Sequence, residues 1–196
     1  MKYFISGWAG FREALDVPED WYFIVPFIDL DEEGILDFFK DKSGSTLIGW
    51  STGGHIILKN LKFFSLRFNE IVIVAGFKKF TDYVHPRIIR RMIDKMEIQP
   101  ETVIKEFLLN AGCKPILSEK ADKNALKEGL KFLLSSEFNY IDYPKNKLIL
   151  IHGSGDKILP IKALFDLKKI FSFAQMHTIS GSHWIPFKVL DSILHS

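Results

Sequence analysis

Cysteine is nearly absent from this chain of 196 residues, since Cys113 stands alone and no disulfide can form within the chain. Long apolar runs are absent too, and none reaches the roughly 20 residues that a helix needs to cross a bilayer. The segment 1–7 is too short, and too soon interrupted by polar residues, to be a secretory signal. We therefore expect a cytoplasmic protein that has no membrane partner.

An excess of one charge sign is also lacking. The formal net charge is +2, so bulk electrostatics gives no reason to expect a nucleic-acid partner. The sequence shows no cluster of His, Cys and Asp residues with metal-ligand spacing, and no glycine-rich loop typical of a phosphate site. We therefore predict neither a metal nor a cofactor.

Short apolar runs alternate with helical patterns, which predicts an α/β fold around a mainly parallel sheet with helices on both faces. The expected strands are Lys2–Ser6, Tyr22–Phe27, Thr46–Trp50, Glu70–Ala75, Lys147–Ile151 and Gln175–Ile179. The expected helices between them are Asp31–Lys40, Thr52–Asn60, Ile161–Phe171 and Trp184–His195.

The alternation is interrupted once, between the strands that end at Ala75 and begin at Lys147. This stretch reads as three helices, expected at Pro86–Met96, Pro100–Ala111 and Glu119–Leu134. We predict one domain, 1–196, in which residues of about 77–140 form a helical cap over the carboxyl end of the sheet.

The most informative motif is Gly49-Trp50-Ser51-Thr52-Gly53, which lies between an expected strand and an expected helix. A serine at such a sharp turn presents its hydroxyl above the sheet edge, and glycines permit the turn where a Cβ would clash. We therefore predict that Ser51 is a nucleophile.

A serine nucleophile needs a histidine base, and the base needs an acid that orients it. In hydrolases with a strand–serine–helix turn, the acid and then the histidine follow the serine along the chain. Asp156 follows the strand that ends at Ile151, and His183 follows the strand that ends at Ile179. Ser51, Asp156 and His183 are therefore the predicted catalytic triad.

Rival residues have weaker positions. Asp142 precedes its strand and would lie at the opposite end of the sheet. His55 and His152 are interpreted as packing residues, and the remaining histidines as surface or strand positions: His85, His177 and His195.

The oxyanion of an acyl-transfer reaction needs two hydrogen-bond donors. One is predicted to be the backbone N–H of Thr52, directly after the nucleophile. The other is the N–H of Trp8, in the loop after the first central strand.

These motifs resemble the α/β-hydrolase superfamily and, within it, the pimeloyl-[acyl-carrier-protein] methyl ester esterases of biotin synthesis. The residues that carry the resemblance are Gly7-Trp8, Gly49-Trp50-Ser51-Thr52-Gly53-Gly54, Gly153 with Asp156 and Pro160, and His183-Trp184-Ile185-Pro186-Phe187. The resemblance implies a serine esterase that hydrolyses a methyl ester on a pimeloyl chain carried by acyl carrier protein.

Three features depart from that family. Ser6 stands where a histidine is usual before the oxyanion glycine. The chain begins at the first central strand, without the leading hairpin of larger relatives, so a sheet of about six strands is expected. The cap is shorter than that of the family.

The cap and the two tryptophans supply the predicted substrate contacts. Trp8, Trp50, Phe77 and Phe107 are the predicted wall of an acyl pocket. Arg87, Arg90, Arg91 and Lys95 can share one helix face and form a predicted docking face for the acidic carrier protein.

Other functions stay open at this stage. One is a general short-chain carboxylesterase or thioesterase of the same fold, whose substrate is a small acyl ester. Another is a protein that binds an acyl ligand or a partner and has no catalytic activity. Ordinary structural roles also stay open: the tryptophans can be core residues, and the basic residues can form a solvated helix face.

Overall fold

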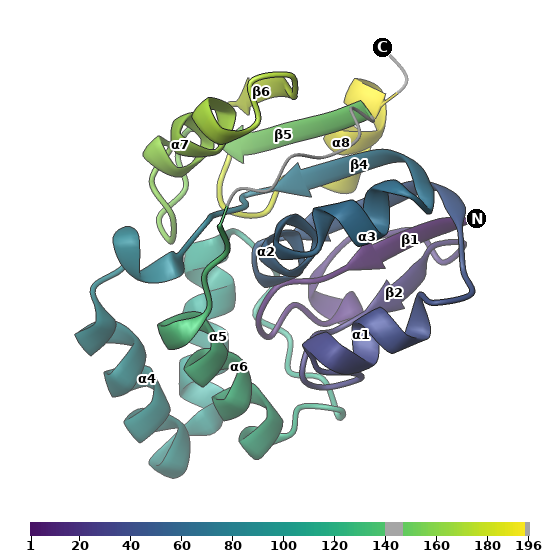
Figure 1. The fold of residues 1–196 in the computed structure, drawn as a ribbon. Helices are drawn as coiled ribbons and strands as arrows, with labels where there is room; N and C mark the ends of the chain where they lie inside the picture. The colour runs from purple at the N-terminus through teal and green to yellow at the C-terminus, as the bar shows by residue number, and fades with distance from the viewer. Residues whose placement is uncertain (140–146, 195–196) are drawn as a thin grey trace.

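The computed structural model describes residues 1–139 and 147–194 (Figure 1). Within these residues, six parallel strands form one sheet in the order β2-β1-β3-β4-β5-β6. The strands are β1 (Lys2–Ile5), β2 (Tyr22–Ile24), β3 (Gly44–Trp50), β4 (Phe68–Val74), β5 (Lys147–Gly153) and β6 (Gln175–Ile179). All six lie where the sequence predicts them, and the sheet is entirely parallel.

The second strand is shorter than predicted, because β2 ends at Ile24 rather than at Phe27. The Asp29 carboxylate accepts a 2.8 Å hydrogen bond from the Val25 N–H, so the backbone turns there. Phe27 has a φ of 68°, which no strand residue adopts.

Alternate strand residues point to opposite faces of the sheet, and both faces are buried. Tyr3 and Ile5 pack under the helices of one face, whereas Phe4 between them packs against the other. The first face is covered by α1 (Glu32–Phe38), α2 (Thr52–Lys59), α3 (Leu61–Ser65) and α7 (Lys162–Ile170). The second is covered by α8 (Phe187–Leu194) and a short 3₁₀ turn, η1 (Arg12–Ala14).

Two predicted helices of these layers need correction. The helix predicted as Thr52–Asn60 ends one residue earlier, at Lys59, and a separate helix, α3, follows after Asn60. The last helix starts at Phe187 rather than Trp184, because Pro186 disfavours helical backbone at the residue before it. The Trp184 N–H donates to the carbonyl of Ala111. Its predicted end, His195, lies outside the described residues.

Three helices follow a 3₁₀ turn, η2 (Phe80–Asp82), between β4 and β5, and we call them the cap helices: α4 (Pro86–Ile98), α5 (Pro100–Ala111) and α6 (Lys123–Ser135). Figure 1 shows them together, at the end of the sheet toward which the strand arrows point. The third begins four residues later than predicted, because the Asp122 side chain caps it by accepting from the Ala125 N–H.

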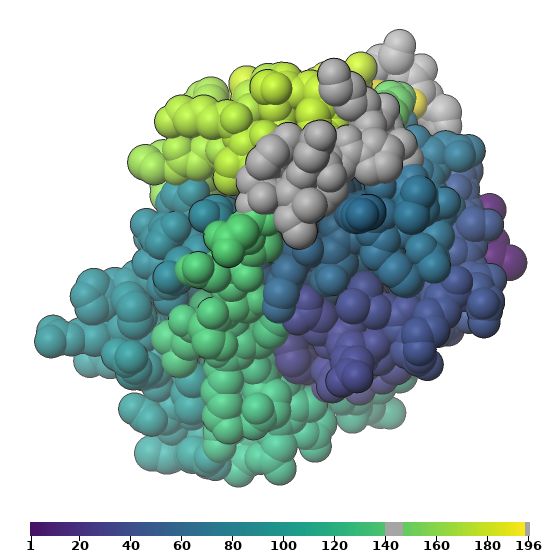
Figure 2. Space-filling view, in the orientation of Figure 1, coloured from purple at the N-terminus to yellow at the C-terminus, as the bar shows by residue number. Residues whose placement is uncertain are grey.

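The cap helices and the N-terminal part of the chain abut in the space-filling view of Figure 2. Ion pairs join α4 to its neighbours, from Lys95 to Glu106 on α5 and from Glu97 to Lys123 on α6. In the described part of the chain, no helix has both the length and the apolar character needed to cross a bilayer.

Candidate active site

Ser51 lies on a strained turn between β3 and α2. Its φ is 52° and its ψ is −112°, a conformation that costs a non-glycine residue on the order of 1–3 kcal/mol. The turn is held by two backbone hydrogen bonds, from the Ser51 N–H to the Val74 carbonyl at 2.8 Å and from the His55 N–H to the Ser51 carbonyl at 2.9 Å. The Ser51 hydroxyl is thereby presented at the carboxyl end of the sheet.

The glycine at 53 is required by close packing of this turn against the first strand. A Cβ at Gly53 would lie 2.2 Å from the carbonyl oxygen of Ile5, far inside van der Waals contact. The Gly53 N–H donates to the Ser6 carbonyl at 3.0 Å. The predicted nucleophile and the loop after β1 are therefore fixed against each other.

The structure brings Ser51, His183 and Asp156 together in a hydrogen-bonded series. The Nδ1 atom of His183 lies 2.7 Å from Oδ2 of Asp156, and its Nε2 atom lies 2.9 Å from Oγ of Ser51. We place the ring hydrogen on Nδ1, because a carboxylate only accepts, so Nε2 is free to accept the serine hydroxyl. The arrangement therefore suits proton transfer from serine to histidine.

The acid loop and the histidine loop hold each other. The Ser154 N–H donates to the Ile179 carbonyl and the Gly155 N–H to the Gly181 carbonyl, both at 2.8 Å. A Cβ at Gly153 would lie 2.0 Å from the carbonyl oxygen of Ser182, so this position also needs glycine. Both loops follow neighbouring parallel strands, which is why residues 27 positions apart meet.

The environment of Asp156 favours its charged form. Burial by itself raises the pKa of this carboxyl, but the positive charge of His183 and hydrogen bonds from His152 and His183 outweigh burial. Its Oδ1 atom also accepts the backbone N–H groups of Ile158 at 2.7 Å and Leu159 at 2.8 Å. Together they hold the pKa of Asp156 well below its usual range, so this side chain is ionised at neutral pH.

Two residues fix the backbone around His183: Trp50, which was predicted to line the acyl pocket, and Asp16, to which no role was assigned from the sequence. The Trp50 indole N–H donates to the His183 carbonyl at 2.9 Å. Asp16 accepts from the Trp184 indole N–H at 3.0 Å and from the Phe187 N–H at 2.9 Å. The partners of Asp16 are about 170 positions away, and no local motif signals such a contact.

The predicted oxyanion donors belong to two segments that contact each other, because the Gly53 N–H after Thr52 donates to the carbonyl of Ser6 in the loop that carries Trp8. Thr52 is the first residue of α2, where backbone N–H groups have no acceptor within the helix. The Trp8 loop is held from within, because the Ser6 hydroxyl donates to the Gly10 carbonyl at 2.5 Å. Ser6 therefore closes this loop with a hydrogen bond from its side chain.

A cavity of about 1230 Å³ lies between the cap helices and the acid loop. Its wall is largely apolar and includes Trp8, Phe107, Ile158 and the acid residue Asp156. Ser51 itself is only 4% exposed and His183 is fully buried, so the cavity approaches the triad from the side of Trp8 and Asp156. Another hollow, of about 690 Å³ beside Arg12, contains none of the triad residues in its wall.

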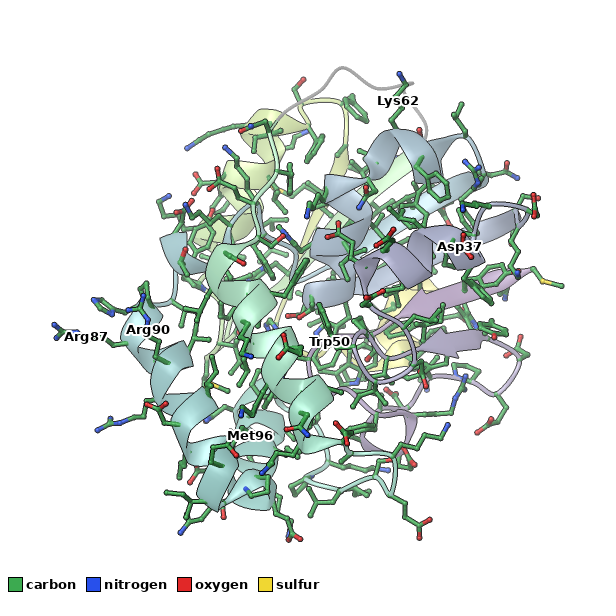
Figure 3. The ribbon with its side chains drawn as sticks, turned by 60° about the horizontal axis from the view of Figure 1, so that its bottom comes forward. Asp37, Trp50, Lys62, Arg87, Arg90 and Met96 are labelled. Carbon is green, nitrogen blue, oxygen red and sulfur yellow. The ribbon has the colours of Figure 1, made fainter. Side chains whose placement is uncertain are left out.

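Of the four aromatic residues predicted to line the acyl pocket, two lie in the cavity wall. Trp8 and Phe107 pack edge to face at 4.9 Å between ring centroids, and the Phe107 ring lies 6.4 Å from that of His183. Trp50 is fully buried in the core (Figure 3), and Phe77 is buried against the His55 ring. Neither is in the wall, since both have buried partners of their own.

The predicted basic face is only partly free. Arg87 and Arg90 project outward from α4 in Figure 3, and Arg91 is exposed at the rim of the cavity. Within the described residues these three arginines form no ion pair. Lys95 instead binds Glu106 on α5 at 3.0 Å, so it belongs to the contact between two cap helices.

Of the other described histidines, His55 and His85 have structural hydrogen-bond partners. His55 is fully buried between the Phe77 carbonyl at 3.1 Å and the Ser136 hydroxyl at 2.8 Å. His85 caps α4 by accepting from the Arg87 N–H, and His177 lies half-buried in β6. His152, by contrast, contacts Asp156 itself, which the sequence analysis missed.

Two further expectations bear on the site. Asp142 and His195, the rival acid and one rival histidine, lie outside the described residues. Among the residues that the structure describes, no group of three or more His, Cys, Asp or Glu side chains is placed to hold a metal ion.

No protein-family model matches this sequence, and no curated protein matches it. Solved structures do. An esterase from Exiguobacterium antarcticum matches with a TM-score of 0.69 at 12% identity, covering 100% of this chain and 90% of that one. MGS-M2, an alpha/beta hydrolase from a deep-sea metagenome library, matches with a TM-score of 0.60 at 11% identity, covering 98% and 86%.

This chain has the α/β-hydrolase fold. A bromoperoxidase from Bacillus anthracis shares it, with a TM-score of 0.62 at 15% identity and coverage of 93% of this chain and 85% of that one. At such low identities the likeness extends to the fold alone. The α/β-hydrolase fold that the motifs predicted is therefore confirmed, and function must be argued from the site.

Proposed function

We propose that this protein is a carboxylic ester hydrolase that uses Ser51 as nucleophile, His183 as base and Asp156 as the orienting acid. The observation that carries the proposal is the hydrogen-bonded series from Ser51 Oγ through His183 to Asp156, at 2.9 Å and 2.7 Å. An activated serine needs a base within hydrogen-bond reach that is itself oriented by a third group. Esterases and hydrolases among the structural neighbours agree with this chemistry.

In the first half of the reaction, Ser51 Oγ attacks the ester carbonyl carbon and its proton passes to Nε2 of His183. The negative charge that develops on the carbonyl oxygen is stabilised by the N–H groups of Trp8 and Thr52. Asp156 stabilises the imidazolium without taking its proton. The ester bond then breaks, the alcohol leaves with the proton from His183, and an acyl-serine remains.

In the second half, a water molecule attacks the acyl-serine. His183 takes one proton from this water, and the same two N–H groups again stabilise the oxyanion. The bond to Ser51 Oγ breaks and the proton returns to that oxygen. The carboxylic acid product leaves, and the enzyme is restored.

Two measurements test the proposal. Hydrolysis of a short-chain nitrophenyl ester should fall at least about 10³-fold in Ser51→Ala, since the nucleophile is gone while binding and the oxyanion donors remain. A fluorophosphonate should label the wild-type protein on Ser51 and leave Ser51→Ala unlabelled. Equal hydrolysis by both proteins, or an unlabelled wild type, would contradict the proposal and favour a non-catalytic binding protein.

For the substrate, we propose the methyl ester of a pimeloyl chain on acyl carrier protein, within biotin synthesis. The resemblance of the sequence motifs supports this substrate, as does a largely apolar cavity beside Trp8 and Phe107. The protein would work in the cytoplasm, in keeping with its single cysteine, which is buried.

Docking of the acidic carrier protein is proposed to use Arg87, Arg90 and Arg91, with Lys95 behind them. Charge reversal of Arg87 and Arg90 should raise KM for the carrier-bound ester. Added salt should likewise raise KM of the wild type for this substrate. Hydrolysis of a nitrophenyl ester by the same variant serves as control and should not change. If neither charge reversal nor salt changes hydrolysis of the carrier-bound ester, the carrier protein does not dock on this surface.

A general short-chain carboxylesterase or thioesterase is the second candidate. The observation that favours it is that Trp50 and Phe77, two of the four predicted pocket residues, are outside the cavity wall. The two candidates differ in one growth experiment. Rescue of a biotin auxotroph that lacks its own esterase supports the pimeloyl substrate, and failure of rescue together with good nitrophenyl ester hydrolysis supports the generalist.

A further inference from the structure

A second buried imidazole contacts the triad carboxylate. The Nε2 atom of His152 lies 3.2 Å from Oδ2 of Asp156, the same oxygen that accepts from Nδ1 of His183 at 2.7 Å. Both imidazoles are fully buried. The carboxylate therefore lies between two histidines, one on the reacting side and one on the far side.

The geometry also assigns the hydrogen of the His152 ring. Its Nε2 atom lies 2.9 Å from the carbonyl oxygen of Leu159, and a carbonyl oxygen can only accept. Nε2 therefore carries the hydrogen and shares it between the Leu159 carbonyl and the Asp156 carboxylate. The other ring atom, Nδ1, is buried and has no partner within the described residues, as expected for a bare lone pair.

A buried histidine with an unpaired nitrogen is costly, and an apolar side chain at this position of β5 would avoid the cost. What the imidazole provides is an N–H donor aimed at Asp156. The carboxylate accepts the backbone N–H groups of Ile158 and Leu159 on Oδ1 and the Nδ1–H of His183 on Oδ2. The His152 Nε2 atom, 3.2 Å from the same Oδ2, adds a fourth and longer contact. Because donors contact both of its oxygens, the carboxylate cannot rotate freely about its bond to Cβ.

We propose that His152 is a positioning residue for the esterase reaction, whose Nε2–H holds the Asp156 carboxylate in the orientation that His183 requires. This inference rests on the proposed function of the triad. His152 acts only through Asp156 and does not touch the substrate. Within the described residues, the titratable groups around that carboxylate are His152, His183 and the exposed Lys157.

Two consequences follow when this donor is removed. The carboxylate loses one of the groups that fix its plane, so His183 is oriented less well and kcat falls. The carboxylate also becomes a stronger base, because one hydrogen bond that stabilised its charge is gone. A stronger base on the far side favours the protonated form of His183 in the free enzyme, so the acid limb of the kcat/KM profile moves to higher pH.

The test compares His152→Leu, which removes the donor, with His152→Gln, whose amide N–H can replace it. We expect His152→Leu to lower kcat about five- to tenfold with little change in KM, and to move the acid limb up by about half a pH unit. His152→Gln should recover at least part of the lost kcat and of the shift of the acid limb. His55→Phe is the matched control, because it removes another buried imidazole that does not touch the triad, and it should leave the acid limb in place.

A measurement on the wild type keeps the inference testable if the Leu variant does not fold. In ¹⁵N-histidine spectra, His152 should show hydrogen on Nε2 only. The Nε2–H signal of His152 should shift when fluorophosphonate modifies Ser51. The modification changes the hydrogen bonding of His183, and that change alters the charge on the Asp156 carboxylate that both histidines contact. A bare Nε2, or a signal that does not respond, would overturn the proposal, as would His152→Leu with unchanged kcat and pH profile. A wild type without turnover or labelling would instead overturn the proposed function.

Discussion

The indole N–H of Trp8 donates a 2.7 Å hydrogen bond to the backbone carbonyl of Leu126 on α6. The loop that is predicted to supply an oxyanion donor is thereby tied to a cap helix 118 positions later in the chain. The same side chain lines the cavity and packs against Phe107. The cap helices and the proposed oxyanion site therefore cannot move independently.

The first prediction concerns Gly129, one turn along α6 from Leu126. A Cβ at this position would lie 2.9 Å from Cδ1 of Trp8, so Gly129→Ala must displace the indole. We expect kcat to fall about fivefold, although alanine favours a helix interior over glycine by roughly 0.5–1 kcal/mol. Activity should thus fall without a loss of thermal stability, measured by ester hydrolysis and by melting.

The control for this variant is Gly34→Ala, which makes the same change in α1, away from the site. It should leave kcat unchanged. If Gly129→Ala has wild-type kcat, the position of the Trp8 indole does not matter for turnover.

The second prediction concerns Ser6, whose hydroxyl closes the Trp8 loop through the Gly10 carbonyl. Ser6→Ala leaves a buried carbonyl without this donor, and the loop gains freedom. One hydrogen bond of about 1 kcal/mol corresponds to a roughly fivefold lower kcat if the loop acts on the transition state. Ser45→Ala, which removes an exposed 3.3 Å hydrogen bond to the Met1 carbonyl, is the matched control. Equal kinetics for both variants would assign Ser6 a packing role only.

The sequence predicts the parts of the site that depend on chain order and strand ends. Parallel strands place their carboxyl ends at one edge, so the residues after β3, β5 and β6 meet there whatever the details of the loops. This is why Ser51, Asp156 and His183 could be selected together. The helix that follows Ser51 and the helices between β4 and β5 were likewise readable from periodicity and from proline and glycine positions.

The sequence could not predict which aromatic residues line the cavity. Both faces of the sheet are buried, so an apolar pattern does not show on which face a residue lies. Trp50 and Phe77 have the composition of pocket walls, but both sides of this sheet are packed, so an aromatic residue at a strand end can equally be core. Asp16 was missed for another reason: its partners lie far away in the chain. His152 was assigned to packing because its contact depends on how the acid loop folds back.

The third prediction concerns Asp16, which accepts from Trp184 and from the Phe187 N–H just after His183. Asp16→Ala leaves both donors unpaired, so unfolding free energy should fall by about 2–3 kcal/mol. The backbone of His183 is also held less firmly, and kcat should fall with little change in KM. Asp16→Asn keeps one acceptor oxygen. Its unfolding free energy, measured by chemical denaturation, should lie between those of the wild type and Asp16→Ala. Wild-type stability of Asp16→Ala would contradict the contact.

The last prediction is a pH dependence of stability that originates at His55. Burial lowers the pKa of this side chain to about 4, against an ordinary value of 6.5. Below pH 6.5 the unfolded chain therefore binds a proton that the folded protein does not, and stability decreases until the folded pKa is reached. The loss should be about 2 kcal/mol at pH 5 and about 3 kcal/mol at pH 4.

Urea unfolding between pH 8 and pH 4 measures this effect. His55→Phe removes the titrating group and should flatten the profile between pH 6.5 and pH 4. Ser136→Ala, the control, removes the hydroxyl partner of His55 but keeps the ring, so it should lower stability at every pH and keep the slope. Asp156 has little effect in most of this window: because its pKa is depressed, its contribution is complete above the ordinary carboxyl pKa, begins to be lost near pH 4 and is lost mainly below that pH. Identical slopes for the wild type and His55→Phe would show that another group causes the acid sensitivity.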